Sequence, residues 1–82
     1  MTTGNSIDRL YQVVESTFGV SATALSEESS PITVDAWDSL NHLNLVMAIE
    51  SEFGVSLSAE EIIAMRNLAL VRGALRAHGV DI

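Results

Sequence analysis

Apolar residues recur along the chain at intervals of three and four, the spacing of amphipathic helices, in four separate stretches. The first stretch begins at Ser6, a candidate N-cap, and ends at Phe18, before a glycine that favours a helix stop. No stretch keeps the strict alternation of a β-strand. The pattern therefore predicts an all-α protein, a small four-helix bundle with a long loop between the first and second helices.

The second and third helices have clear sequence signals at their ends. The second helix is predicted to begin at Asp38 or Ser39 and to end at Phe53, before a glycine. A short third helix is predicted after Ser58, because Ser58 and Glu61 have the spacing of a capping box.

The fourth helix is predicted over residues 67–78, with an apolar stripe along one side. The connection over residues 19–37 is long, rich in Ser, Thr and Glu, and contains the single proline. Connections of this length in a compact protein are often functional. We expect its apolar side chains to pin it to the core: Val20, Leu25, Ile32, Val34 and Trp37.

The predicted second helix carries two apolar stripes when its residues are projected at about 100° each. One stripe is expected to seal the core and consists of Leu45, Val46, Ile49 and Phe53. The other lies well round the helix and consists of Leu40, Leu43 and Met47. Two interpretations stay open for it. It packs under the long loop, or part of it is exposed for partners. Both hold if Leu40 packs inward while Leu43 and Met47 face outward.

The composition fits one small domain, residues 1–82, without a covalent or metal staple. The chain has no cysteine, which excludes disulfides and thiolate metal sites. Its two histidines, His42 and His78, lie far apart and have no spaced ligands around them, so we predict no metal site.

The formal net charge is −7, and the four basic residues are all arginine. This balance argues against nucleic acids and anionic membranes as partners, and it favours basic protein surfaces. No apolar stretch is long enough to cross a bilayer, and the first residues lack the pattern of a signal peptide. We expect a monomeric, cytoplasmic protein.

Ser39 is the strongest candidate for chemistry, because it lies between Asp38 and Leu40 where the long loop meets the second helix. A helix N-terminus favours a phosphate group through its free N–H groups and its dipole. Serine and aspartate are also common helix caps, so the tripeptide alone does not decide its role. Ser39 and His42 could suggest a nucleophile and a base, but no third group orients them, and we predict no enzyme.

Residues 37–40 read Trp-Asp-Ser-Leu, and residues 43–55 continue with an apolar and acidic pattern that ends in Glu-Phe-Gly-Val. Together with the predicted order of helices and the long loop, this run resembles the acyl carrier protein family. The resemblance covers nearly the whole sequence. It is specific for the family and does not identify a pathway.

The resemblance implies that a phosphopantetheinyl transferase attaches a 4′-phosphopantetheine arm from coenzyme A to Ser39, flanked by Asp38 and Leu40. The arm's thiol would carry acyl groups as thioesters, and the protein would be a tether that delivers them. Implied partners are acyl ligases, synthases and acyltransferases with basic docking surfaces. The cargo chain is expected to enter between the second and third helices, into an interior formed by Leu45, Ile49, Ile62, Ile63, Leu68 and Leu75.

The resemblance also implies a partner-binding face, which consists of Leu43, Asn44, Met47, Glu50, Glu60 and Glu61. Carriers of the fatty-acid-synthesis type have acids in the first turns after the serine. This chain has Asn41 and Asn44 there, and Ser51 replaces a further acid. We therefore expect a dedicated carrier of an accessory lipid, polyketide or related pathway, not the housekeeping fatty-acid carrier.

Two alternatives stay open. Aminoacyl or peptidyl carriers usually have glycines before the serine, where this chain has Trp37 and Asp38. A protein of a different class, an unmodified helical adaptor, would bind partners through the second helix and would take up no arm. The mass of the intact protein after treatment with a transferase distinguishes the adaptor from a carrier.

Overall fold

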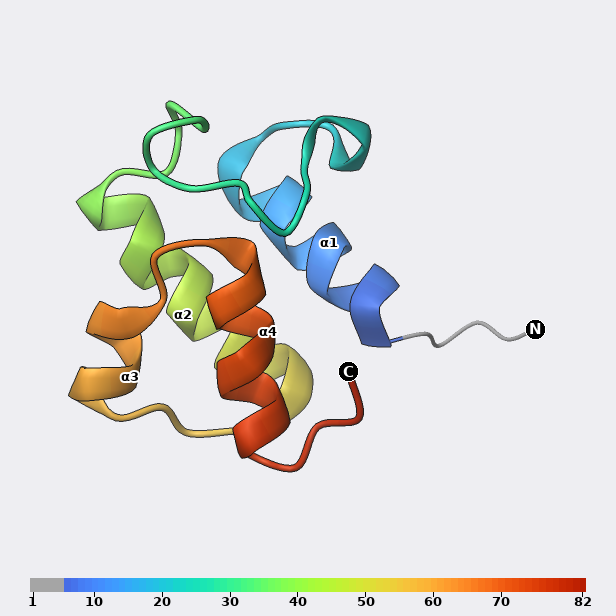
Figure 1. Cartoon of the computed structure of the whole chain (residues 1–82), viewed down its shortest axis with the longest axis vertical. Coiled ribbons are helices and arrows are strands. Elements are labelled where there is room, and N and C mark those ends of the chain that lie inside the picture. The colour runs from blue at the N-terminus through green and yellow to red at the C-terminus, as the bar shows by residue number, and fades with distance from the viewer. Residues whose placement is uncertain (1–5) are drawn as a thin grey trace.

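The computed structural model describes residues 6–82 and contains four α-helices, a short 3₁₀ helix and, within those residues, no strand (Figure 1). In chain order the elements are α1 (Ser6–Phe18), η1 (Ala22–Ala24), α2 (Ser39–Phe53), α3 (Ala59–Ala64) and α4 (Leu68–Ala77). The predicted all-α class and small helical bundle are confirmed. Of the helices in residues 6–82, none has the length and apolarity needed to cross a membrane.

The predicted helix ends agree with the structure at nearly every position. Asp38 is the N-cap of α2, and Gly54 closes this helix with a φ of 67°, a left-handed conformation that glycine adopts without strain. Ser58 and Glu61 form the predicted capping box of α3. Ser6 is the exception, because it is the first helical residue of α1 and the residue before it lies outside the described part of the chain.

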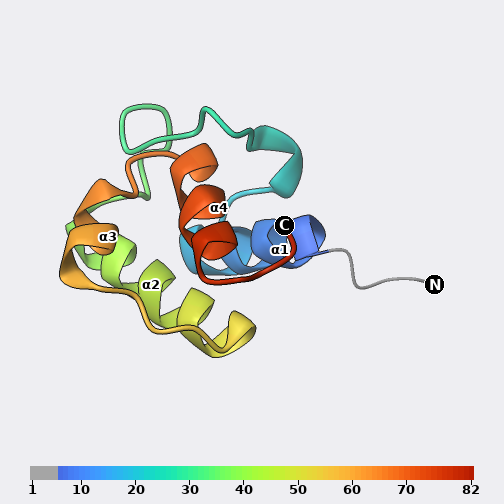
Figure 2. The same ribbon diagram turned by 60° about the horizontal axis from the view of Figure 1, so that its bottom comes forward.

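One apolar core joins all four α-helices. Helices α1, α2 and α4 each contribute a buried stripe, and α3 is followed by a buried methionine. Two views show α3 at the edge of the bundle beside α2, on the side opposite α1 (Figures 1 and 2). The most completely buried side chains are Leu10, Val14, Leu45, Ile49, Met65, Leu68, Val71 and Leu75.

The long loop is ordered by its own contacts and passes over the start of α4 (Figure 1). The Ser29 carbonyl accepts a hydrogen bond from the Leu68 N–H at 3.1 Å, and a neighbouring carbonyl accepts from the Ala69 N–H. These hydrogen bonds satisfy backbone N–H groups of the first helical turn, which have no partner within the helix. The loop thus caps α4 and does not lie over the second stripe of α2.

Most of the predicted loop anchors lie in or against the core. Leu25, Val34 and Trp37 are buried, and Val20 is half-buried. The prediction is wrong for Ile32, whose side chain is 91% exposed. It lies in a tight turn that is closed by hydrogen bonds involving Ser30 and Thr33. This turn directs the side chain outward.

Candidate functional site

The start of α2 presents Ser39 as an exposed first helical residue. The Asp38 carboxylate accepts a hydrogen bond from the Asn41 N–H at 2.8 Å, and the Asp38 carbonyl accepts one from the His42 N–H at 2.8 Å. These contacts leave the N–H groups of Ser39 and Leu40 as the open donors of the first turn. A phosphate on the Ser39 hydroxyl would lie beside both donors and at the positive end of the helix dipole.

A surface hollow of about 620 Å³ adjoins Ser39, and we call it the Ser39 hollow. Its walls come from the end of the long loop, the first turns of α2, and α3 with the residues just after it. Most of the lining is apolar, and the charged groups are one carboxylate and one guanidinium. The lining residues are Pro31, Trp37, Asp38, Ser39, His42, Leu43, Ile62, Ile63, Met65 and Arg66.

His42 joins three elements at the wall of this hollow. The Trp37 indole N–H donates to His42 Nδ1 at 2.9 Å, and His42 Nε2 lies 2.8 Å from the Ile62 carbonyl oxygen. An indole nitrogen only donates and a carbonyl only accepts, so the neutral ring with its proton on Nε2 satisfies both contacts. One imidazole therefore links the long loop, α2 and α3.

These contacts give His42 a structural role instead of a role as a base for Ser39, since both ring nitrogens are engaged elsewhere. Its partner Trp37 is 2% exposed and packs against Phe18 of α1, with 5.2 Å between ring centroids. The sequence did not indicate the His42 bridge. Its Ile62 partner lies 20 residues away, and a backbone carbonyl leaves no mark in the residue pattern.

The second stripe of α2 is exposed. Leu40, Leu43 and Met47 are 69%, 52% and 60% exposed, so the interpretation in which the stripe packs under the loop is wrong. The mixed arrangement, with Leu40 packed inward, is also wrong. Leu40 shares a helix face with Leu43 and Met47, and the loop that was expected to cover that face caps α4 instead.

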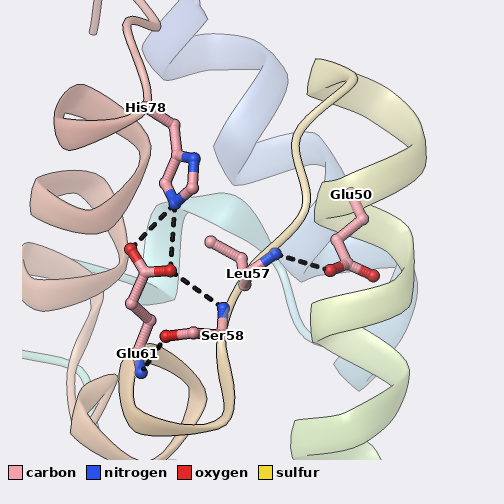
Figure 3. A network of polar contacts seen from close by, with 5 residues as sticks. All are labelled: Glu50, Leu57, Ser58, Glu61 and His78. Atoms are coloured by element: carbon pink, nitrogen blue, oxygen red, sulfur yellow. Dashed lines mark hydrogen bonds and ion pairs between the residues drawn. The ribbon is translucent and has the colours of Figure 1, made fainter.

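Two of the three acids predicted to bind partners take part in a polar network (Figure 3). Glu50 Oε2 accepts from the Leu57 N–H at 2.8 Å and so joins α2 to the segment before α3. Glu61 accepts from the Ser58 N–H at 2.9 Å and lies 2.8 Å from His78 Nε2. The Ser58 backbone N–H first, and then the His78 side chain, lower the pKa of the Glu61 carboxyl.

The remaining polar residues near this face differ in their surroundings. Glu60 is exposed. Glu52 pairs with Arg9 of α1, with 2.9 Å between its carboxylate and Arg9 Nε. Asn44 is half-buried and donates to the Asn41 side chain at 3.1 Å. The two asparagine side chains in the first turns after Ser39 are therefore neutral and hydrogen-bonded to each other.

The side chains expected to form the cargo interior divide into two groups. Leu45, Ile49, Leu68 and Leu75 are fully buried, and Ile62 is half-buried. The placement of Ile63 in the interior is wrong, because it is 69% exposed and lines the Ser39 hollow. Neighbouring residues on a helix point about 100° apart, and α3 buries the side that carries Ile62. The role of the buried group as a cargo site stays a prediction.

Comparisons with known proteins bear on the family of the chain. No family model matches the chain. The chain is 30% identical, over 71 residues, to an acyl carrier protein of Clostridium acetobutylicum. That alignment covers 87% of this chain and 92% of the relative. Similarity over nearly the full length of both chains means that this protein belongs to the acyl carrier protein family.

Proposed function

We propose that the protein carries acyl intermediates as thioesters on a 4′-phosphopantetheine arm attached to Ser39. The observation that supports this most strongly is the exposed Ser39 hydroxyl at the first residue of α2, in a member of the acyl carrier protein family. The arm supplies the thiol that holds the cargo, which a chain without cysteine lacks. The protein is a carrier in this proposal, and its partners perform the chemistry.

Attachment of the arm requires a phosphopantetheinyl transferase and coenzyme A. The bond from Ser39 Oγ to phosphorus forms as the pyrophosphate bond of coenzyme A breaks. Adenosine 3′,5′-bisphosphate leaves, and the hydroxyl proton passes to the transferase. The open N–H groups of Ser39 and Leu40 stabilise the phosphodiester, and Arg66 contributes a positive charge from the lining of the same hollow.

Delivery requires a docking surface beside Ser39, and we assign it to the exposed stripe of α2 with the neighbouring polar residues. Its apolar part consists of Leu40, Leu43 and Met47. Its polar part consists of Asn44, Glu50, Glu60 and Glu61. Acyl ligases, synthases and acyltransferases with basic surfaces are the proposed partners. Among these three acids, Glu60 has the carboxylate most available to a partner, because Glu50 and Glu61 accept hydrogen bonds within the chain.

The neutral first turns of α2 favour an accessory lipid or polyketide pathway. Asn41 donates to the Ala36 carbonyl at 2.8 Å, and Asn44 donates to Asn41. Neither position presents a negative charge to a partner, so charge guides docking less strongly there. We infer that the partners of this carrier differ from those of the fatty-acid-synthesis type.

The absence of cysteine makes the proposal easy to test. The purified chain has no thiol of its own, so a thiol reagent gives no signal before modification. After incubation with coenzyme A and a phosphopantetheinyl transferase, and removal of the coenzyme A, we expect one thiol per chain and a matching mass increase. A chain that gains neither mass nor thiol is an unmodified adaptor, and the proposal fails.

A further inference from the structure

The charged side chains that line the Ser39 hollow are Asp38 and Arg66. Within residues 6–82 they form no ion pair with each other. The Asp38 carboxylate has a partner already, because it accepts the hydrogen bond from the Asn41 N–H that caps α2. The guanidinium of Arg66 is therefore the one permanent cation of the hollow, and no acid of the described chain neutralises it.

Arg66 differs in this respect from two of the other three arginines. Arg9 and Arg72 form ion pairs with glutamates from distant parts of the chain. Arg66 and Arg76 are exposed and form no ion pair with any residue that the structure describes. Of these two, only Arg66 lines the Ser39 hollow. A guanidinium without an acidic partner can bind an anion of another molecule or of an attached group.

The rest of the lining suits a small apolar group. Leu43 and Ile63 are 52% and 69% exposed, so their aliphatic surfaces are open to solvent. Trp37 and Met65 are each 2% exposed and form the inner part of the lining. The hollow thus presents one cation together with aliphatic surface, directly beside Ser39.

A phosphopantetheine arm carries the matching groups in the matching order. Its first group after the serine oxygen is a phosphodiester, which bears one negative charge. Next comes the pantoyl unit, with two methyl groups on one carbon. Arginine pairs with phosphate through two parallel hydrogen bonds, and methyl groups gain free energy when they leave water. The two amides and the thiol that follow can stay hydrated, because the hollow is open at the surface.

We infer that Arg66 binds the phosphodiester of the arm and that the Ser39 hollow receives the pantoyl unit, so that the arm leaves Ser39 in one direction. The inference rests on the proposed function of Ser39. Charge favours this direction, because Asp38 repels the phosphodiester and Arg66 attracts it. The formal net charge of the chain is already −7, which makes a local cation important for a further negative group. Arg66 is a positioning residue, and the thiol end of the arm stays free to reach a partner.

The test follows the arm itself by NMR. A transferase attaches an unlabelled arm from coenzyme A to the isotope-labelled protein, and intact mass confirms the product. Isotope-filtered NOE spectra then detect contacts between the pantoyl methyl groups and methyl groups of the protein. We expect contacts with Leu43 and Ile63. The phosphorus signal of the phosphodiester should also be displaced from its position in the same holo protein unfolded in urea.

Three variants isolate the guanidinium. Arg66→Gln removes the charge, so the pantoyl contacts should be lost and the phosphorus signal should move toward its unfolded position. Arg66→Lys keeps the charge without the planar fork and should restore part of both signals. Arg76→Gln is the matched control, because it removes an unpaired arginine that does not line the hollow, and it should behave like the wild type. Both arginines are exposed, so circular dichroism should be unchanged in all three variants.

Each other outcome overturns the inference in a recognisable way. A holo protein without pantoyl contacts, whose phosphorus signal matches that of the unfolded chain, has its arm in solvent. The gained mass would then leave the proposed function standing. Contacts that persist unchanged in Arg66→Gln show that the walls alone hold the arm, and equal losses in Arg76→Gln show an effect of net charge. A chain that gains no mass overturns the proposed function, and the inference falls with it.

Discussion

The two apolar stripes of α2 have the same chemistry and opposite surroundings. Leu45, Val46 and Ile49 are buried against the rest of the bundle, whereas Leu43 and Met47 are more than half exposed. The buried stripe stabilises the fold through the apolar area it removes from water. The exposed stripe lies beside Ser39 and adds nothing to the core. This difference assigns stability to one side of the helix and leaves the other side exposed for the recognition that we propose.

The helical period decides which residues share a face, but it does not decide which face is covered. Both stripes of α2 were visible in the sequence as candidates for burial. Helices α1 and α4 provide buried side chains that pack with the first stripe, and the long loop, which was a possible cover for the second, caps α4 instead. Only the tertiary contacts distinguish the two.

The largest expected effect on stability is that of Ile49→Ala in the buried stripe. Ile49 is fully buried, so the change removes apolar contacts and leaves a cavity. We expect the free energy of unfolding to fall by about 2–5 kcal/mol, measured by urea denaturation followed by circular dichroism. A loss as small as that of an exposed substitution would show that the stripe does not seal the core.

A smaller effect is expected from Glu50→Ala, on the side of α2 that faces the segment before α3. The change leaves the half-buried Leu57 N–H without its acceptor and should lower the free energy of unfolding by about 1–3 kcal/mol. Glu50→Gln is the matched control, because its amide oxygen can still accept. If both variants unfold like the wild type and only partner turnover falls, Glu50 belongs to the recognition side alone.

Glu61 should give a weaker, pH-dependent effect, because solvent screens its side chain. Its lowered pKa means that folding favours the ionised carboxylate. This contribution is complete above the pKa of an unfolded glutamate, about 4.3, and disappears as the pH falls through the lower folded value. Stability measured between about pH 6 and pH 3 should therefore fall less steeply in Glu61→Gln, which keeps a capping-box side chain. Equal slopes for both proteins would contradict the lowered pKa.

The smallest effect on stability is expected from Met47→Ala in the exposed stripe. Its side chain contributes little to the core, so the free energy of unfolding should change by no more than about 0.5 kcal/mol. The rate at which partner enzymes use the carrier should fall. This rate is measured as enzyme turnover at a saturating concentration of the acyl-coenzyme A substrate. A lower melting temperature with unchanged turnover would reverse the assignment of the two stripes.

Local signals in the sequence predicted the helix ends well, because caps act over three or four residues. The Asp38 cap, the Ser58 capping box and the stop at Gly54 each depend on neighbours in the chain. The same local reasoning placed Ser39 at the start of α2. Its position is therefore a consequence of helix-capping chemistry that a single sequence displays.

Contacts between distant residues could not be predicted in the same way. The His42 bridge needs the Ile62 carbonyl, and Glu50 needs the Leu57 N–H, so both depend on how the chain folds back. Backbone groups carry no residue identity, and the pattern gives no sign of which side chain will meet them. Ile63 was misplaced for a related reason, since α3 is too short to define a buried face by periodicity.

The central claim, that Ser39 carries the arm, is tested most directly by intact mass after treatment with coenzyme A and a phosphopantetheinyl transferase. Three proteins are compared: the wild type, Ser39→Ala, and Ser51→Ala, which removes another exposed serine of the same helix. We expect the wild type and Ser51→Ala each to gain the mass of one phosphopantetheine group, and Ser39→Ala to gain nothing. An unchanged wild type, or a Ser39→Ala protein that still gains the arm, would contradict the claim.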